Sequence, residues 1–321
     1  MKSINIIVIA SILMQIGYIS STPLPLYLCR STGVNLSLVD LESGSLKPYL
    51  NYTQDFIMDY NNIYFINSST IIGSGSILNS EYYAYQYLNV ETNVEALYQF
   101  DFLAQFPLLN SFFNPNTNQI IIYNETILSL DPIEYQPNGI NISLPSIIPY
   151  ALVVGSVNSL LDSNNNILYF NVEVPPFPQM KKQYLNKDGE YACSFVIGCK
   201  YLISFDLQSG EIKSSVNMHF WTNVYTLALP ISSTSVICLS INKNNEITFD
   251  NINPATGLMK TLKSSENQYE FIYSFTADTV NQIVYLFLSG DVVLSYNYQS
   301  NQINTVTLTN PGGTLIKVGS N

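Results

Sequence analysis

Short segments of alternating apolar and polar residues recur along the chain, each ending in Asp or Asn before a turn rich in Ser, Gly and Asn. A period of two predicts half-buried β-strands, and a terminal Asp or Asn can bond backbone N–H groups of the following turn. The clearest copy runs from Tyr201 to Gly210. The other copies are Leu36–Gly44, Tyr85–Asn93, Ile127–Pro132, Ile247–Gly257 and Val293–Asn301. Their spacing of roughly 45 residues, with one longer interval, is typical of propeller blades.

A second motif precedes most of these copies. An Asn-rich turn leads into an apolar strand containing Tyr or Phe, at Asp59–Ile66, Asn114–Tyr123, Asp162–Phe170 and Asp278–Leu286. Together the two motifs give four strands per unit, which we call a, b, c and d. Many short, evenly spaced strands without an amphipathic helical pattern predict an all-β protein. We expect a β-propeller of six four-stranded blades, with five or seven blades as the alternatives.

The two ends of the apolar pattern predict how the ring closes. Pro25–Leu28 has the pattern of a b strand, and Thr314–Val318 that of a lone strand. One blade shared between the termini would use both strands and remove the open edge. The expected organisation is a signal peptide at 1–21 and a propeller domain at 22–321, with a loop insertion at 174–200.

The strand pattern resembles the blades of YVTN-type and quinoprotein-like propellers, best at Tyr201–Gly210. The resemblance covers nearly the whole mature chain and implies a fold without specifying an activity. The chain lacks the Trp-Asp pairs of WD repeats and the paired glycines of kelch blades. Quinoprotein dehydrogenases dock their blades through repeated tryptophans, whereas Trp221 is the only Trp here. We therefore expect no quinone or other cofactor.

The first residues have the order of a cleavable signal peptide. Lys2 precedes an almost wholly apolar run at Ile4–Ile19, and small residues follow up to Thr22. The apolar run is short for a membrane span, which needs about 20 residues. We expect a mature protein that begins near Thr22 and is secreted, with no stable membrane span. An uncleaved anchor is one alternative, and residence in the lumen of the endolysosomal or secretory pathway is another.

The charge of the chain bears on its partners and its solubility. The formal net charge is −11, so repulsion of phosphate backbones argues against nucleic acid as a partner. Charged residues make up 11%, against roughly 25% in typical soluble domains. Glycans would supply the missing solubility. N-x-S/T sequons occur at Asn35, Asn51, Asn67, Asn124 and Asn141, although a chain so rich in Asn, Ser and Thr produces some sequons by chance.

The four cysteines fall into two kinds of surroundings. Cys193 and Cys199 close a short loop, and we predict a disulfide between them, which an oxidising compartment permits. Cys29 and Cys238 lie in apolar strand-like runs and are expected to be small buried hydrophobes. With no CxxC motif and one His in the chain, we expect no metal site.

Residue types that usually carry catalysis do not form a recognisable motif. His219 is the only His, no G-x-S-x-G accompanies it, and it is expected to be structural. Gly73–Ser76 reads as a b–c connection with no helix after it, which argues against a phosphate loop. The acids Asp40, Asp131, Asp206 and Asp250 are predicted to be turn residues. A glycosidase pair among Asp55, Asp59, Glu81 and Asp101 remains open. We therefore assign no catalytic residue.

The leading function is a secreted or luminal glycosylated binding module for a protein, glycan or cell-surface partner. A propeller hydrolase acting on carbohydrate or ester substrates is the alternative, and a structural extracellular-matrix component is the third. Acids clustered in the central channel would favour the enzyme. An uncharged, aromatic or loop-dominated face would favour binding.

The longer interval between two copies predicts where a partner binds. Residues 174–200 exceed the blade period and gather prolines, lysines and aromatic residues. The candidate contacts are Phe177, Lys181, Lys182, Tyr184, Lys187 and Tyr191. The strand assignment places Asn35, Asn51, Asn67 and Asn124 on the same face as this loop, in the first three blades. We expect an acidic or glycan partner there, and a merely tolerated insertion is the alternative.

Overall fold

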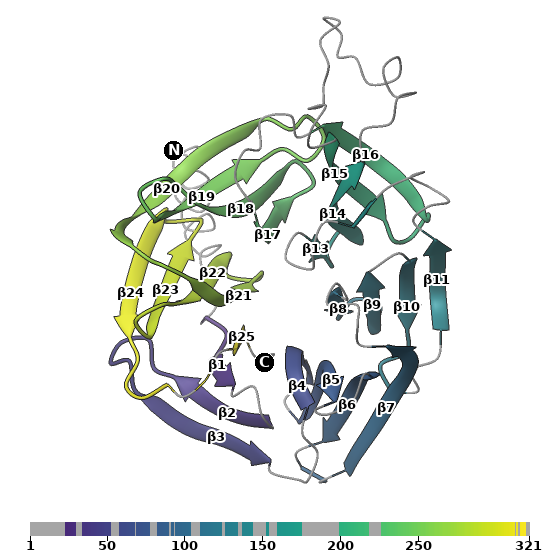
Figure 1. Ribbon diagram of the computed structural model, residues 1–321, viewed down its shortest axis with the longest axis horizontal. Helices are drawn as coiled ribbons and strands as arrows, with labels where there is room; N and C mark the ends of the chain where they lie inside the picture. Colours follow the sequence, from purple (N-terminus) through teal and green to yellow (C-terminus); the bar gives the residue numbers. More distant parts are fainter. Residues whose placement is uncertain are drawn as a thin grey trace, which may run out of the picture.

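The protein is a ring of antiparallel β-sheets around a central axis (Figure 1). The computed structural model describes residues 23–29, 34–52, 58–67, 69–77, 82–89, 91–92, 94–103, 110–123, 126–133, 137–143, 152–153, 159–174, 199–217, 226–311, 313 and 315–318. Every regular element in these ranges is a strand. Within them, no helix long and apolar enough to cross a membrane is found.

Six sheets form the ring, which confirms the predicted all-β, six-bladed propeller. From the axis outward, blade 1 consists of β25 (Leu315–Val318), β1 (Leu26–Cys29), β2 (Val34–Val39) and β3 (Leu46–Tyr52). Blade 2 consists of β4 (Met58–Asn67), β5 (Thr70–Ile77), β6 (Tyr82–Asn89) and β7 (Val94–Leu103). Blade 3 consists of β8 (Asn110–Asn114), β9 (Gln119–Tyr123), β10 (Thr126–Leu130) and β11 (Pro137–Ser143).

The second half of the ring repeats this order. Blade 4 has two short inner strands, β12 (Leu152–Val153) and β13 (Ser159–Asp162), which both pair with β14 (Ile167–Val174), and then β15 (Cys199–Asp206) and β16 (Glu211–Asn217). Blade 5 consists of β17 (Thr226–Ser232), β18 (Ser235–Ile241), β19 (Glu246–Ile252) and β20 (Met259–Gln268). Blade 6 consists of β21 (Ile272–Asp278), β22 (Ile283–Leu288), β23 (Val292–Asn297) and β24 (Gln302–Thr307).

The ring closes in blade 1, as the sequence predicted. Strand β25 pairs with β1 in antiparallel register, from Leu26 opposite Val318 to Cys29 opposite Leu315. A second contact ties the start of the described chain to blade 6, because the backbone N–H of Leu24 donates to Oδ2 of Asp278 at 2.9 Å. Asp278 is fully buried and ends β21. We call this contact the Asp278 latch.

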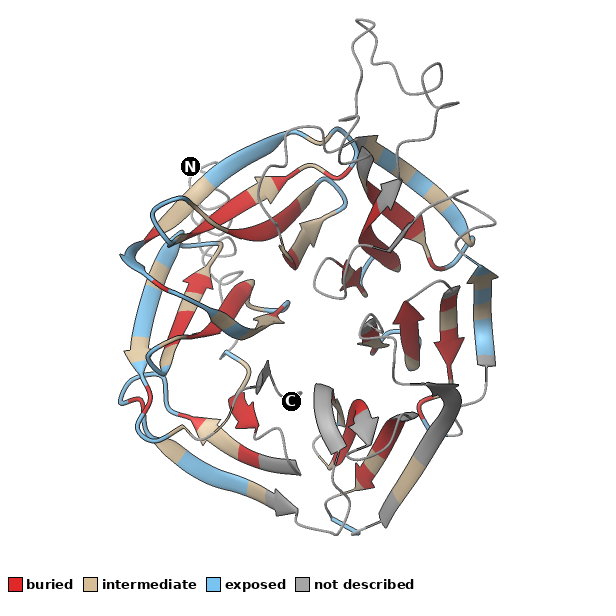
Figure 2. Cartoon of the chain, viewed as in Figure 1, coloured by how far each residue is buried: buried red, intermediate tan, exposed pale blue. Residues whose placement is uncertain are grey.

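The hydrophobic core lies between neighbouring blades, and strand alternation builds it. On β14, Leu168 and Phe170 join a cluster with blade 3, whereas Tyr169 packs with Leu227 and Cys238 of blade 5. Successive side chains of a strand point to opposite faces, so one buried strand serves two interfaces. Figure 2 shows the result, with buried residues on the middle strands and exposed ones along the outer strands.

The turn after strand c has one conformation in several blades. In blade 1, Oδ1 of Asp40 accepts from the N–H groups of Glu42 and Ser43, and the Gly44 N–H returns to the Asp40 carbonyl at 2.8 Å. Gly44 has φ +71°, a region that favours glycine. Asp206 accepts from the N–H groups two and three residues on, and Asp131 from the N–H two residues on. The turn roles predicted for Asp40, Asp131 and Asp206 are confirmed.

The turn role predicted for Asp250 is wrong. Asp250 lies inside β19, is 2% exposed and bonds the hydroxyls of Thr248 and Thr261. Asn253 caps the turn instead, with Gly257 four residues later at φ +73°. Strand c of blade 5 continues two residues beyond Asp250, to Ile252, so Asn253, which stands four residues before the closing glycine, takes the cap.

Two predicted boundaries in blade 2 are also wrong. Gly73–Ser76 is not a connection but lies inside β5, where Gly73 pairs with Ile63. The segment Asp59–Ile66 belongs to the inner strand β4, with a bulge between Tyr60 and Asn62, and is not an Asn-rich turn followed by strand b. The small residues of β5 and the neighbouring Asn61 and Asn62 of β4 both have the composition of a loop, and this caused the two errors.

Candidate functional site

The connections between strands differ in length on the two faces of the ring. The a–b and c–d connections leave one face, which we call the turn face, and the b–c and d–a connections leave the other, which we call the loop face. Turn-face connections run from two residues (68–69) to six (253–258). Loop-face connections reach eight residues at 218–225 and twenty-four at 175–198. Because loops on a rigid scaffold commonly carry function, the loop face is the first candidate.

The segment predicted as an insertion at 174–200 falls between β14 and β15, the b and c strands of blade 4. It joins Val174 of β14 to Cys199 of β15, and these two residues are paired across the strands. The six candidate contacts (Phe177, Lys181, Lys182, Tyr184, Lys187 and Tyr191) lie outside the described residues, as does Cys193. Their roles and the Cys193–Cys199 disulfide therefore stay predictions.

The sequons divide between the two faces. Asn35 and Asn51 pair across β2 and β3 at the loop-face end of blade 1, and Asn141 lies at the same end of β11. Asn67 is the last residue of β4 and begins an a–b turn, so its predicted place on the loop face is wrong. Asn124 is outside the described residues. Glycosylation at all five remains a prediction.

Two aromatic side chains stand exposed on the loop face near the axis. Phe271 is 61% exposed and Tyr273 is 52% exposed, at the start of the inner strand β21. The N–H of Glu270 donates to Oγ of Ser289 in the adjacent b–c connection, which fixes the backbone beneath these rings. Large exposed aromatic residues are enriched where proteins meet partners.

A cavity of about 340 Å³ opens at the turn-face end of the central channel. Its walls come from the inner strands of four blades and are mainly apolar or hydroxyl-bearing. The lining residues are Leu24, Ile63, Tyr64, Phe65, Ile66, Phe112, Phe113, Pro115, Leu160, Leu161, Ser163, Thr276, Ala277 and Thr279. The Tyr64 hydroxyl bonds the backbone carbonyl and the hydroxyl of Ser111 on the next inner strand. Such a cavity can bury an apolar group.

The acids beside this cavity accept hydrogen bonds from residues of their own turns. Asp162 accepts from the backbone N–H and the side-chain amide of Asn165, and Asp278 makes the same pair of bonds to Asn281. Burial, together with the negative charge of Asp162, raises the pKa of Tyr169 to about 12, so its hydroxyl stays protonated. The hydrogen bonds of Asp162 and Asp278 hold these carboxylates within their own turns.

Other residues singled out in the sequence do not assemble into a site. Asp59 lies on the innermost strand of blade 2 and Asp101 on the outermost, so two strands separate them. Asp55, Glu81, His219 and Trp221 are outside the described residues. In the part of the chain that is described, no cluster of three His, Cys, Asp or Glu side chains could hold a metal.

Cys29 and Cys238 are fully buried, as predicted. Cys238 lies between blades 4 and 5, where burial, followed by the charge of Asp250, raises the pKa of its thiol well above the usual value. A neutral, enclosed thiol is a poor nucleophile and metal ligand. The surroundings therefore agree with a packing role for Cys238.

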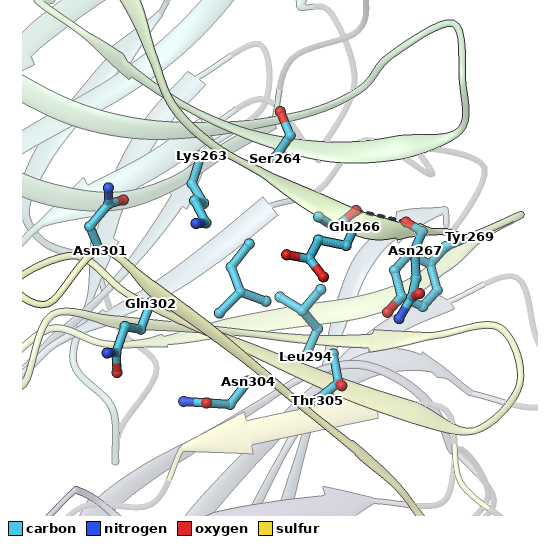
Figure 3. Close-up of a pocket in the computed structure, with 12 residues that line it drawn as sticks. Lys263, Ser264, Glu266, Asn267, Tyr269, Leu294, Asn301, Gln302, Asn304 and Thr305 are labelled. Atoms are coloured by element: carbon cyan, nitrogen blue, oxygen red, sulfur yellow. Dashed lines mark hydrogen bonds between the residues drawn. The ribbon is translucent and has the colours of Figure 1, made fainter.

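One feature escaped the sequence analysis. A groove of about 410 Å³ lies on the outer rim between β20 of blade 5 and β24 of blade 6 (Figure 3). The lining residues are Lys263, Ser264, Ser265, Glu266, Asn267, Tyr269, Leu294, Asn301, Gln302, Ile303, Asn304 and Thr305. No sequence motif marks it, because its residues come from two separate blades.

Comparisons with known proteins support the fold. No protein-family model matches the chain, and no curated protein is significantly similar in sequence. Among solved structures, the chain is similar to a putative 6-phosphogluconolactonase from Bacteroides uniformis, with 10% identity and a TM-score of 0.51, over 92% of this chain and 99% of that one.

Two further structures show the same similarity. The periplasmic gluconolactonase PpgL of Pseudomonas aeruginosa has 12% identity and a TM-score of 0.50, over 93% of this chain and 99% of that one. The β-propeller domain of Cps50 (Swd1) from Myceliophteria thermophila has 9% identity and a TM-score of 0.50, over 88% and 83%. At these identities the similarity defines the class alone, which is the β-propeller, and confirms the propeller resemblance at the level of fold.

Proposed function

We propose that this β-propeller is a secreted or luminal glycoprotein that acts as a binding module and contacts its partner through the loop face. The observation that carries the proposal is the exposed aromatic pair Phe271 and Tyr273 on the face with the longest connections. An exposed aromatic side chain buries a large apolar area at small entropic cost when a partner covers it. The turn face also exposes large apolar residues, among them Ile133 and Leu258, but its connections are no longer than six residues.

The insertion 175–198 adds a second element to this surface. Lys181, Lys182 and Lys187 gather several of the few cations of a chain with net charge −11. An acidic or sialylated glycan partner would find its opposite charge there, and long-range repulsion from the remaining surface would confine it to that region. We therefore place the partner contact across blades 4 to 6 of the loop face.

The channel cavity supports binding over hydrolysis. Its lining is apolar and hydroxyl-bearing, and the two nearby acids, Asp162 and Asp278, each accept bonds from their own turns. Acid–base catalysis needs a carboxyl group within reach of a substrate proton. An ester or carbohydrate hydrolase would have to use residues other than these.

Export and glycosylation can be tested together on the secreted full-length protein. N-terminal sequencing should give a first residue near Thr22, and peptide-N-glycosidase should convert occupied sequons to Asp with a fall in mass. Recovery only in membranes with Met1 retained would overturn the proposal of export.

Partner binding can be tested with two variants of the loop face. One replaces 176–198 with a Gly-Asn turn, and the other is the double variant Phe271→Ala, Tyr273→Ala. The matched control is Ile133→Ala, Leu258→Ala, which removes apolar residues that are 59% and 74% exposed on the turn face. Binding of fluorescent protein to the cells that secrete it should fall about tenfold or more for the loop-face variants and stay unchanged for the control. Unchanged binding by both loop-face variants would refute the assignment of the face.

A further inference from the structure

The cavity at the turn-face end of the channel is walled by the innermost strands of the ring. Strands β4, β8, β13 and β21 stand around the axis in Figure 1, and each contributes residues to the lining. Leu24 of blade 1 completes the wall, and the volume enclosed is about 340 Å³. Because the lining comes from separate blades, the closed ring sets the shape of the cavity.

Four aromatic side chains of this wall stay partly exposed at the centre of the molecule. They are Tyr64 and Phe65 on β4, and Phe112 and Phe113 on β8. Each of them also packs against a hydrophobic core between two blades. The part of each ring that the core leaves uncovered therefore borders the cavity.

Contacts behind the wall hold its aromatic side chains in place. The ring of Phe65 stacks on that of Tyr27 in blade 1, with centroids 5.1 Å apart. The hydroxyl oxygens of Tyr64 and Ser111 are hydrogen-bonded at 2.7 Å, and Ser111 lies on the neighbouring inner strand β8. Side chains that are already fixed lose little entropy when a ligand covers them, which favours binding.

The lining excludes charged ligands, because none of its side chains carries a charge. Asp162 and Asp278 directly follow the lining residues Leu161 and Ala277 in the chain, yet both acids are buried and hydrogen-bonded within their turns. A charged ligand would lose its hydration here without gaining a counter-ion. The cavity therefore selects an uncharged molecule.

A few hydrogen-bonding groups accompany the apolar wall. The hydroxyls of Ser163, Thr276 and Thr279 belong to the lining, and they make no hydrogen bond with another described residue. In the described part of the chain, each inner strand is also paired on its outer side alone, so backbone groups of its inner edge face the channel. A ligand can therefore satisfy one or two polar groups of its own.

We propose that this cavity binds an uncharged bicyclic aromatic molecule of about the size of indole or naphthol. A dry cavity of about 150 Å³ lined by Leu, Ile and Phe binds benzene. The present cavity has about twice that volume, which matches two fused rings. Its aromatic walls can pair with the ligand in tilted or offset arrangements, a contact that an aliphatic ligand cannot make.

The first experiment titrates the secreted protein with indole and with 2-naphthol by isothermal titration calorimetry. Tryptamine and indole-3-acetate serve as a cation and an anion of similar shape. We expect at least one uncharged compound to bind with a dissociation constant below about 1 mM, and both charged compounds to bind at least about tenfold more weakly. The loop-face contact proposed above lies on the other face of the ring, so either proposal can fail without the other.

Two variants of the wall test the location of the site. Thr276→Phe places a ring in the space of the ligand and should weaken binding at least about tenfold. Phe113→Leu keeps an apolar side chain but removes a ring, and it should weaken binding roughly threefold to tenfold. The matched control is Thr226→Phe, the same substitution on the inner strand β17 at a position outside the lining, which should bind like the wild type. Near-ultraviolet circular dichroism and thermal melting verify that each variant is folded.

Crystals grown with 5-bromoindole locate the ligand directly, through the anomalous scattering of bromine. We expect the bromine peak between β4, β8 and β21 at the turn-face end of the channel. Absence of binding by both uncharged compounds would overturn the proposal, and so would a bromine peak elsewhere alone. Equal binding by the wild type and the two wall variants, a loss in Thr226→Phe as large as in Thr276→Phe, or equally tight binding of a charged compound would also refute it.

Discussion

The contact between blades 6 and 1 can be probed at a single glycine. Gly44 is buried in the c–d turn of blade 1 with φ +71°, and its carbonyl accepts from the Thr309 N–H at 3.1 Å. A Cβ at this position would lie 2.1 Å from the carbonyl oxygen of Thr307. The substitution Gly44→Ala therefore adds a steric clash to the cost of positive φ.

Gly290 provides the matched control. It has φ +78°, and a Cβ there would meet no atom within 4 Å, so Gly290→Ala adds the backbone cost alone. That cost is about 1–2 kcal/mol for an L-residue in the left-handed region. At Gly44 the two backbones must also separate by about 1 Å, and overpacking of this kind costs a further 1–3 kcal/mol, roughly. We expect Gly44→Ala to destabilise the protein by about 2 kcal/mol more than Gly290→Ala.

Equilibrium unfolding in urea, followed by circular dichroism, measures both variants against the wild type. The slope of the transition should stay unchanged, so the shift of the midpoint reports the difference in stability. Equal destabilisation by the two substitutions would show that Thr307 does not pack against Gly44. The close approach of blades 6 and 1 would then be wrong.

Three further outcomes are expected. Asp278→Ala should lower the free energy of unfolding in urea by about 2 kcal/mol more than Asp162→Ala does, because Asp278 accepts hydrogen bonds from two additional backbone N–H groups. Equal losses of stability would show that the Asp278 latch does not stabilise the ring. The thiol of Cys238 should resist a thiol reagent at pH 8 until the protein unfolds, and rapid labelling of the folded protein would contradict its burial. The hydrogen bond from Lys213, with two backbone N–H bonds, holds the pKa of Asp206 below its usual 3.8. The wild type should therefore be more stable against urea than Asp206→Asn at neutral pH, and this difference in stability should disappear as the pH falls through the lowered pKa. A difference in stability that persists in acid would contradict the ion pair.

The architecture was accessible from the sequence because the same local chemistry repeats. Asp40 and Asp206 stand four residues before Gly44 and Gly210, and each pair forms the same turn. Six such hairpins fix the number of blades, and the unmatched end strands fix the closure. The repeated turn chemistry was therefore enough to predict most of the fold.

The errors arose where local composition and tertiary position disagree. Asp250 has the sequence setting of a turn cap, yet it is buried among the hydroxyls of β19 and its neighbours. Gly73 and Gly75 have the composition of a loop, yet they form a buried strand beside β4. A short pattern cannot report which face of a sheet a neighbouring blade will cover.

The groove could not be predicted for a related reason. Lys263 and Thr305 are ordinary polar residues in the sequence, and only the ring brings their two outer strands to one groove. The bulge in β20 beside the groove depends on Ser265, whose hydroxyl replaces a ladder bond. A serine in a polar strand gives no sequence signal of that role.

The pairing of β1 with β25 has a consequence for biosynthesis. The ribosome completes Leu26 first and must pass Val318 before the partner strand exists. At about 5–20 residues per second, on the order of 15–60 s of translation separates the two. Throughout that interval β1 presents an unpaired inner edge, the kind of edge that recruits other chains. A message that stops before codon 315 would leave this edge unpaired for good and would yield an open, association-prone ring.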